Sequence, residues 1–391
     1  MKLAVLPLVI FSLIQSSPVS QQHQLIYVQA VWRHGDRTPQ NGFKTDTITE
    51  SDWIKETGNG FGQLTSLGIK QQVNLGKAIR RRYIEKEFQF LPEDYDASVM
   101  HIRTTDTNRT FKSAEANMLG MYPDGHNFSF YRTIGYKKDC AGAVFCKCPR
   151  VDKLYQLSNN LEENKIFAKE SEVVEILNKL TEYYGETITL DNIWRVFDNL
   201  NCQRIHFPER LKEKTWYNEE LYQKLLNISY ESNERFFGLY ETANSTILNG
   251  IDISSETKKL RVSALVEEIS KRLRNKLENS DDIIKYHAYS AHDATVFAVL
   301  SALELHDHAA NSPGEWPNYA AAVFIELYQN QRNEPFFKLV YRKDENSNFE
   351  DLTRNIPQCV DQEYCPFKIF EEITKTYKIE KPILEYCQQL P

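Results

Sequence analysis

The sequence predicts an α/β fold: a doubly wound, mixed, mainly parallel sheet with helices on both faces, plus a mainly helical cap lobe. Two observations support this prediction. Strand-forming segments alternate with segments of helical periodicity near both ends of the chain. Between 140 and 249 the strand signals fade and helical patterns dominate. We therefore expect residues 21–139 and 250–391 to form the α/β core and residues 140–249 to form the cap.

The first half of the core begins with a buried strand. Residues 25–31 are apolar and rich in β-formers, and a Gly/Pro-containing loop follows them. Apolar residues at helical spacing predict a helix over 65–87. A second short strand over 98–102 leads into a helix that ends near Met121, for which Asp106 is the expected N-cap.

The remaining elements continue the same alternation. Helical patterns recur at 171–184 and 219–242 in the cap and at 257–277 in the core. Strand patterns recur at 283–289, 321–328 and 336–341. The last two flank a short polar stretch, which is typical of a hairpin.

Composition and charge restrict the class of protein. The chain has 391 residues, 41% of them hydrophobic, which is enough for a large core. It carries 47 basic and 54 acidic residues, a formal net charge of -7, so an anion site must be a local concentration of positive charge. Arg80, Arg81 and Arg82 lie inside an amphipathic pattern, and we expect them to form a solvated helix face. No nucleic-acid partner is expected.

The N-terminus has the pattern of a signal peptide. Lys2 precedes an apolar run over 3–14, and a polar stretch with small residues follows over 15–20. The apolar run is too short to span a bilayer. We expect residues 1–20 to be removed, no membrane anchor in the mature chain, and a secreted (extracellular) or lysosomal location.

Cysteines and glycosylation sequons agree with an oxidising compartment. There are seven cysteines, so at least one is unpaired or pairs between chains, and their spacings do not resemble a zinc site. Asn-x-Ser/Thr sequons make Asn127, Asn227 and Asn244 candidate glycosylation sites. A fourth sequon, at Asn108, lies where a glycan would crowd the expected functional site.

Charged and titratable side chains follow three of the predicted strands. They are Arg33, His34 and Arg37 after the first strand, Arg103 after the second, and His292 with Asp293 after the strand at 283–289. In open α/β sheets, ligands bind beyond the carboxyl ends of strands. The three loops can therefore converge on one site.

This set of side chains suits phosphate-ester chemistry. Guanidinium groups bind and neutralise phosphate oxygens bidentately, so neither a metal nor another cofactor is required. A neutral imidazole, that of His34, can attack phosphorus, and Asp293 can protonate the leaving oxygen. Clustered arginines keep His34 neutral but also favour ionised Asp293. We therefore expect an acidic pH optimum.

Motifs typical of other phosphatase classes and of metal sites are weaker in this sequence. Asp94-Tyr95-Asp96 resembles an aspartyl-phosphate motif but does not follow a buried strand. No cysteine is followed six positions later by arginine, which excludes a cysteine-dependent phosphatase on spacing. His306-Asp307-His308 could bind a metal, but its Gly/Pro/Asn neighbours indicate a surface loop.

With these residues in place, the chain resembles the histidine acid phosphatases, over residues 25–387. The resemblance rests on the segments 33–39 (RHGDRTP), 60–65 (GFGQLT), 102–106 (IRTTD) with Arg109-Thr110, and 289–295 (YSAHDAT). It implies that His34 is the phosphorylated nucleophile and Asp293 the proton donor. It further implies that Arg33, Arg37, Arg103 and His292 bind phosphate.

The resemblance also bears on disulfides and assembly. It implies the pairs Cys148–Cys387 and Cys359–Cys365. The family's partner for a cysteine near Cys202 is absent, so Cys202 is free or pairs with Cys140 or Cys146. The segment before Cys148, which helps form the subunit contact in dimeric relatives, is short and poorly matched. A homodimer remains possible, and the oligomeric state is open.

The sequence thus predicts a metal-free acid phosphatase that hydrolyses phosphate monoesters, small or protein-borne, through a phosphohistidine. One alternative is a narrower inositol-phosphate or lysophospholipid phosphatase. The other is a non-catalytic secreted binding protein on the same scaffold.

Overall fold

A computed structural model describes residues 23–391, except 86, 126, 136, 143, 145, 241–245, 280 and 310–315. The expected signal peptide (1–20) and the sequon at Asn244 lie outside the described residues. None of the described helices is both long enough and apolar enough to cross a membrane.

A central mixed sheet organises the fold, in the strand order β10-β8-β7-β1-β6-β2-β3, with β9 paired to β8. The strands are β1 (Gln24–Arg33), β2 (Met100–Thr104), β3 (Phe130–Arg132), β6 (Tyr286–Ala291), β7 (Ala322–Gln329), β8 (Pro335–Arg342), β9 (Glu350–Asp351) and β10 (Cys365–Pro366). Strands β1, β6, β2 and β3 run parallel to one another, and β7, β8, β9 and β10 add antiparallel pairs. The predicted α/β fold is confirmed, and each predicted strand has a counterpart.

The register brings the carboxyl ends of three parallel strands to one edge. Arg33 of β1 lies opposite Ala291 of β6, and Thr104 of β2 lies opposite Ser290 of β6. The loops after these strands therefore start side by side, although they are far apart in the sequence. This edge carries the candidate site.

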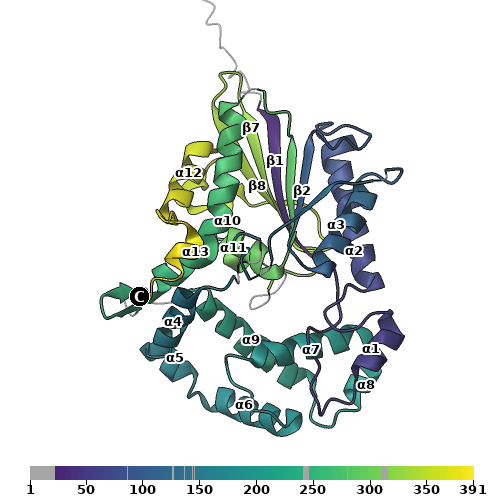
Figure 1. Cartoon of the computed structure of the whole chain (residues 1–391), viewed down its shortest axis with the longest axis vertical. Coiled ribbons are helices and arrows are strands. Elements are labelled where there is room, and N and C mark those ends of the chain that lie inside the picture. The colour runs from purple at the N-terminus through teal and green to yellow at the C-terminus, as the bar shows by residue number, and fades with distance from the viewer. Residues whose placement is uncertain are drawn as a thin grey trace, which may run out of the picture.

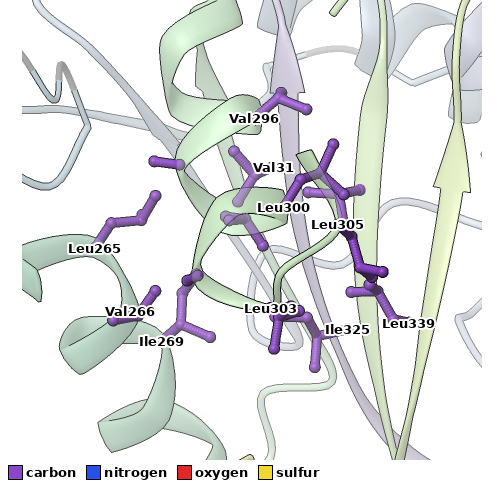
Figure 2. Packing of buried hydrophobic residues seen from close by; sticks show 14 of the residues in the cluster. Val31, Leu265, Val266, Ile269, Val296, Leu300, Leu303, Leu305, Ile325 and Leu339 are labelled. Atoms are coloured by element: carbon purple, nitrogen blue, oxygen red, sulfur yellow. The ribbon is translucent and has the colours of Figure 1, made fainter. Parts of the chain in front are cut away.

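Helices cover both faces of the sheet. On one face lie α10 (Ile253–Glu278), α11 (Asp293–Ala302) and α12 (Phe367–Thr376), and on the other α2 (Ser66–Arg80) and α3 (Asn108–Met121). Figure 2 shows Leu265 and Ile269 of α10 packed near Leu300 and Leu303 around α11. Burying each such side chain contributes about 1.5–3 kcal/mol, so this core fixes α11 and the loop before it.

A mainly helical part lies beyond the carboxyl ends of the parallel strands (Figure 1). It contains α4 (Pro149–Ser158), α5 (Glu162–Phe167), α6 (Ser171–Tyr184), α7 (Ile193–His206), α8 (Pro208–Lys212) and α9 (Glu219–Phe236). Phe43 packs into its core, and Trp53 of α1 (Glu50–Thr57) packs against Phe207. The early segment around these two residues thus contacts the helical part, although the sequence assigns it to the α/β core. The domain boundaries stay predictions.

Short elements complete the chain. They are β4 (Ile247–Leu248), β5 (Ile251–Asp252), the π-helical turn η1 (Arg81–Glu85), the 3-10 turns η3 (His306–His308), η4 (Thr353–Asn355) and η5 (Pro357–Cys359), and α13 (Ile383–Tyr386).

Three disulfides are present among the described residues: Cys140–Cys146, Cys148–Cys387 and Cys359–Cys365. The alternatives for Cys202 reduce to a free thiol, which is buried in α7. Cys148–Cys387 ties the start of α4 to the end of α13 across a sequence separation of 239 residues. The helical part is therefore covalently joined to the C-terminal segment.

Local expectations fail at three helix ends. Thr107, not Asp106, is the N-cap of α3, and Asp106 pairs with Arg132 at 3.8 Å. The helix predicted over 65–87 is α-helical only to Arg80 and continues as the π-helical turn η1 to Glu85, from which Arg82 pairs with the buried Glu326 of β7. The arginine triplet is thus not a solvated face throughout. The helix predicted over 219–242 ends at Phe236, before Gly238 at φ +75°.

Candidate active site

The backbone of the RHGDRTP loop is held tightly at the sheet edge. The His34 amide donates to the Ala291 carbonyl at 3.0 Å, and the Thr105 amide donates to the Ser290 carbonyl at 3.2 Å. A Cβ at Gly35 or Gly68 would collide with backbone atoms, of Gly68 in the first case and of Asp36 in the second. Glycines at both positions therefore allow α2 to start directly against the loop.

His34 is buried and oriented by its own loop. Its side chain is 2% exposed, and Nδ1 lies 2.8 Å from the Gly35 carbonyl oxygen. A carbonyl oxygen only accepts, so Nδ1 carries the proton of the neutral ring. The lone pair is then on Nε2. The ring of His292 lies 5.6 Å away, centroid to centroid, at an interplanar angle of 77°.

Each of the three predicted phosphate-binding arginines is paired with a carboxylate. Arg33 lies 3.2 Å from Asp293, Arg37 lies 2.8 Å from Asp198, and Arg103 lies 2.8 Å from Asp139. Cations buried together repel one another and lose hydration, and partner carboxylates offset both costs. The site thus holds its positive charge in place before any anion arrives.

Further contacts fix the planes of two of these guanidinium groups. Arg33 donates to the Pro317 carbonyl at 2.6 Å and lies over the Tyr319 ring at 4.1 Å. Arg103 lies over the Tyr289 ring at 4.7 Å and 3.5 Å from Glu268 of α10. Bidentate recognition depends on such fixed planes.

His292 and Asp293 lie at the start of α11. Nε2 of His292 is 2.9 Å from the Thr105 hydroxyl, which in turn contacts the Thr110 hydroxyl at 2.9 Å. Asp293 is the first residue of the helix, and its Oδ1 accepts from the Ala294 amide at 2.8 Å. The carboxyl is therefore held where the positive end of the helix dipole favours its charged form.

Burial and neighbouring charges shift the pKa values of these groups. Burial, followed by the charges of Arg109 and Arg33, holds the pKa of His34 well below its usual value. The pKa of His292 is lowered by burial and Arg109 in the same way. Burial by itself would raise the pKa of Asp293, but Arg33 and Arg37 bring it below its usual value. A neutral His34 beside an ionised Asp293 is therefore the resting state.

The site includes residues that motif reasoning did not select. Asp198 comes from α7, and Asp139 also accepts from the Gly142 amide at 2.8 Å. Arg109 is the second residue of α3, lies within a segment that carries the family resemblance, and is the strongest charge acting on both site histidines. No local pattern marks the two carboxylates, because each is recognisable only through the arginine it meets.

A second hydrogen-bonded group supports the loop from behind. Asp36 is fully buried, its Oδ2 accepts from the Thr65 hydroxyl at 2.5 Å, and it lies 2.7 Å from Nε2 of His206 in α7. The aspartate of the motif thus links the loop to α2 and to the helical part. No contact among the described residues joins Asp36 to the phosphate-binding arginines.

The rival motifs lie elsewhere. Asp94-Tyr95-Asp96 is in a loop, and Asp96 accepts from the Ser98 amide at 2.8 Å. His306 and Asp307 of η3 do meet a third potential ligand, Glu234 of α9, with ligand atoms within 4.8 Å of one another. Asp307 is exposed there, so this group has the character of a surface cluster.

The sequons differ in their surroundings. Asn127 and Asn227 are exposed. The side-chain amide of Asn108 is also on the surface, but it donates to Oε1 of Gln63 at 2.8 Å. A glycan on Asn108 would break this contact between α3 and the loop before α2.

Comparison with known proteins identifies the family and the fold. A Caenorhabditis elegans protein, whose name provisionally assigns it as acid phosphatase 10, is 32% identical over 93% of this chain and 94% of its own. Bovine prostatic acid phosphatase is 30% identical over 90% of this chain and 84% of its own. The solved structure of Hafnia alvei phytase superposes with a TM-score of 0.62 at 15% identity, covering 96% of this chain and 100% of the phytase, and so shares the fold. The family described as histidine phosphatase superfamily (branch 2) matches residues 24–342, and the chain belongs to it.

Proposed function

We propose that the protein is an acid phosphatase that hydrolyses phosphate monoesters through a phosphohistidine on His34. Membership of the histidine phosphatase superfamily and the acid phosphatase names of its relatives support the activity. The observation that carries the mechanism is the His34 hydrogen bond: Nδ1 is committed to the Gly35 carbonyl, which leaves the Nε2 lone pair as the nucleophile.

In the first step, Nε2 attacks phosphorus and the bond from phosphorus to the ester oxygen breaks. Asp293 in its acid form gives its proton to the departing alkoxide, so an alcohol leaves. Arg33, Arg37 and Arg103, with His292, bind the non-bridging oxygens, whose charge they stabilise throughout the transfer. The products of this step are the alcohol, phosphorylated His34 and ionised Asp293.

In the second step, water attacks the phosphohistidine. Ionised Asp293 takes a proton from the water, the phosphorus–nitrogen bond breaks, and His34 returns to its neutral form with phosphate as the product. The same carboxyl thus acts as acid and then as base, and it ends each cycle protonated.

The charges around Asp293 bear on the working pH. In the free enzyme its pKa is low, largely through Arg33, so the acid form is scarce at neutral pH. A bound phosphate monoester adds negative charge to the same arginines and favours the proton on Asp293. Low pH acts in the same direction, while the lowered pKa of His34 keeps the nucleophile neutral in mild acid. An acidic optimum follows.

The test is hydrolysis of p-nitrophenyl phosphate at acidic pH by the folded wild type and by His34→Ala. We expect the variant to lose activity by several orders of magnitude. His23→Ala is the matched control, because His23 stacks on Tyr364 and precedes the opposite end of β1. Inactive, folded wild type would refute the activity, and a fully active His34→Ala would refute the mechanism.

Substrate range and location are part of the proposal. We infer broad monoester specificity, since the three arginines recognise the phosphoryl group and not the leaving group. A panel of sugar, inositol, lysophospholipid and protein phosphates would reveal a narrower preference as one substrate dominating kcat/KM. Three disulfides support an extracellular or lysosomal site of action, with glycans on Asn127 and Asn227.

A further inference from the structure

A cavity of about 560 Å³ lies apart from the His34 cluster, and its wall carries three arginines. It is formed by the end of α2, the turn η1, the last residue of β8 and the loop over 345–349. The arginines are Arg81, Arg82 and Arg342, and none of the predicted catalytic or phosphate-binding residues lines this cavity.

The cavity lies on the same sheet edge as the catalytic loops, two strands away. Arg342 of β8 is opposite Ala322 of β7, and Ala322 is opposite Trp32 of β1. The Trp32 side chain packs toward α2 and α3, whereas His34 and its partners lie beyond the strand end. The cavity and the His34 cluster are therefore neighbours in the fold but have no lining residue in common.

Arg342 is the unusual member of the three. Its side chain is 4% exposed, yet Nη1 is buried without a hydrogen-bond partner among the described residues. Nη2 donates to the Glu345 carbonyl oxygen, and no described carboxylate forms an ion pair with this guanidinium group. A buried cation with an unsatisfied donor is costly unless an anion completes it.

The neighbouring charges leave room for such an anion. Arg82 is matched by Glu326 at 2.8 Å and by Glu87. Arg81 is exposed and forms no ion pair in the described part of the chain. Burial and the charge of Arg81 lower the pKa of Arg342, although Asp344 and Glu345 act to raise it. Glu87 and Glu345 also line the cavity, so its three arginines meet two carboxylates there.

The remaining walls indicate the body of the ligand. The side chains of Asn346 and Asn348 offer hydrogen-bonding groups, whereas the Ser347 hydroxyl donates to Asp344. Phe349 adds an aromatic ring that packs edge-on against Phe324 and carries the Arg82 guanidinium over one face. The volume falls in the range of small-molecule sites and far exceeds a bare oxyanion. Amide groups beside an aromatic ring suit a polyhydroxylated body.

We propose that this cavity is a second ligand site that binds a phosphate or sulfate group carried on a sugar-like, hydroxylated body, with Arg342 and Arg81 holding the oxyanion. The ligand would complete the hydrogen bonding of Arg342 and bridge the two arginines. This site is independent of the proposed hydrolysis, because it shares no lining residue with the His34 cluster.

The test is calorimetric titration of the full chain with galactose 6-sulfate, whose sulfate ester a phosphomonoesterase does not cleave. We expect saturable binding, at least tenfold tighter than that of inorganic sulfate, and none with galactose. Inorganic phosphate and galactose 6-phosphate, the latter in the His34→Ala background, distinguish free anion from sugar-borne anion in the same way. Equal affinity for free and sugar-borne anions would overturn the role of the hydroxylated body, and binding of uncharged galactose would overturn the role of the oxyanion.

Variants locate the site. Arg342→Gln and Arg81→Gln should each weaken binding at this site tenfold or more, whereas exposed Arg354→Gln should not, and Arg33→Gln should weaken only the binding at the His34 cluster. Because Arg81 is on the surface, Arg81→Gln should stay folded, so it tests the site even if Arg342→Gln unfolds. Hydrolysis of p-nitrophenyl phosphate should be unchanged in Arg81→Gln. No saturable binding to the wild type, or loss of binding in Arg33→Gln with retention in Arg81→Gln, would overturn the proposal.

Discussion

The ion pair between Arg37 and Asp198 offers a direct test of how the site stores positive charge. The two groups are 2.8 Å apart, and their side chains are 5% and 15% exposed. Asp198 raises the pKa of Arg37 against the opposing effect of burial. Asp198→Asn keeps the size and an acceptor oxygen but removes the charge that balances Arg37.

The expected cost follows from the burial of the pair. Removing one partner of a buried ion pair costs about 3–5 kcal/mol, because the other charge is left uncompensated. The amide oxygen of asparagine can still accept from Arg37, but its NH2 group would then face the Gln40 amide, which donates to Oδ2 of Asp198 at 2.9 Å. We therefore expect a cost within this range, about 3–5 kcal/mol. An oxyanion in the site would replace the lost charge, and inorganic phosphate should therefore stabilise the variant more than the wild type.

The assay is urea unfolding of both proteins, with and without inorganic phosphate, under conditions that give a reversible transition. Asp191→Asn is the matched control, because Asp191 is exposed, precedes the same helix and accepts only from the Tyr155 hydroxyl among the contacts described. This control should change the unfolding free energy by about 1 kcal/mol or less. Unchanged stability of Asp198→Asn would refute the reasoning, and so would an equal effect of phosphate on variant and wild type.

Three further predictions concern the acid, its pKa and the covalent framework. Arg33→Gln removes the nearest cation from Asp293, so the carboxyl keeps its proton to higher pH. The alkaline limb of the kcat/KM profile should therefore move to higher pH. A limb that stays at the same pH would contradict the assignment of Asp293. Asp293→Asn should lower kcat/KM for alkyl phosphates by about 10²–10⁴, but far less for p-nitrophenyl phosphate, whose phenolate leaves without a proton; equal losses on both substrates would argue against a proton-donor role. Cys148→Ser with Cys387→Ser should lower the unfolding free energy by about 2–5 kcal/mol, since this disulfide closes a loop of 239 residues, and calorimetry showing no loss would contradict that.

Sequence reasoning succeeds where local pattern and fold geometry coincide. The loops after β1, β2 and β6 could be expected to meet, because buried strands were recognisable and parallel strands end at one edge. His34 and Asp293 then follow from their positions just after β1 and β6, and Arg103 from its position near the end of β2. The hairpin of β7 and β8 was equally visible in its alternation and polar turn.

The residues that complete the site could not be predicted in this way. Asp198 lies in a helix whose sequence shows only amphipathic spacing, and it reaches Arg37 only because the helical part packs over the sheet edge. Asp139 reaches Arg103 only because the loop after β3 folds back toward β2. The inward turn of Arg82 depends on a buried glutamate 244 residues later in the chain. Such contacts are set by tertiary packing, which no local pattern encodes.

The central claim is that the Nε2 atom of His34 receives the phosphoryl group, because Nδ1 is held by the Gly35 carbonyl. The most direct measurement is rapid quenching of the enzyme with a labelled monoester, followed by mapping of the phosphorylated residue and of the phosphorylated ring nitrogen. We predict an acid-labile, base-stable phosphohistidine at position 34, bonded through Nε2 and absent from His34→Ala. Phosphate on Nδ1, on another residue, or no phosphoenzyme during turnover would contradict the account.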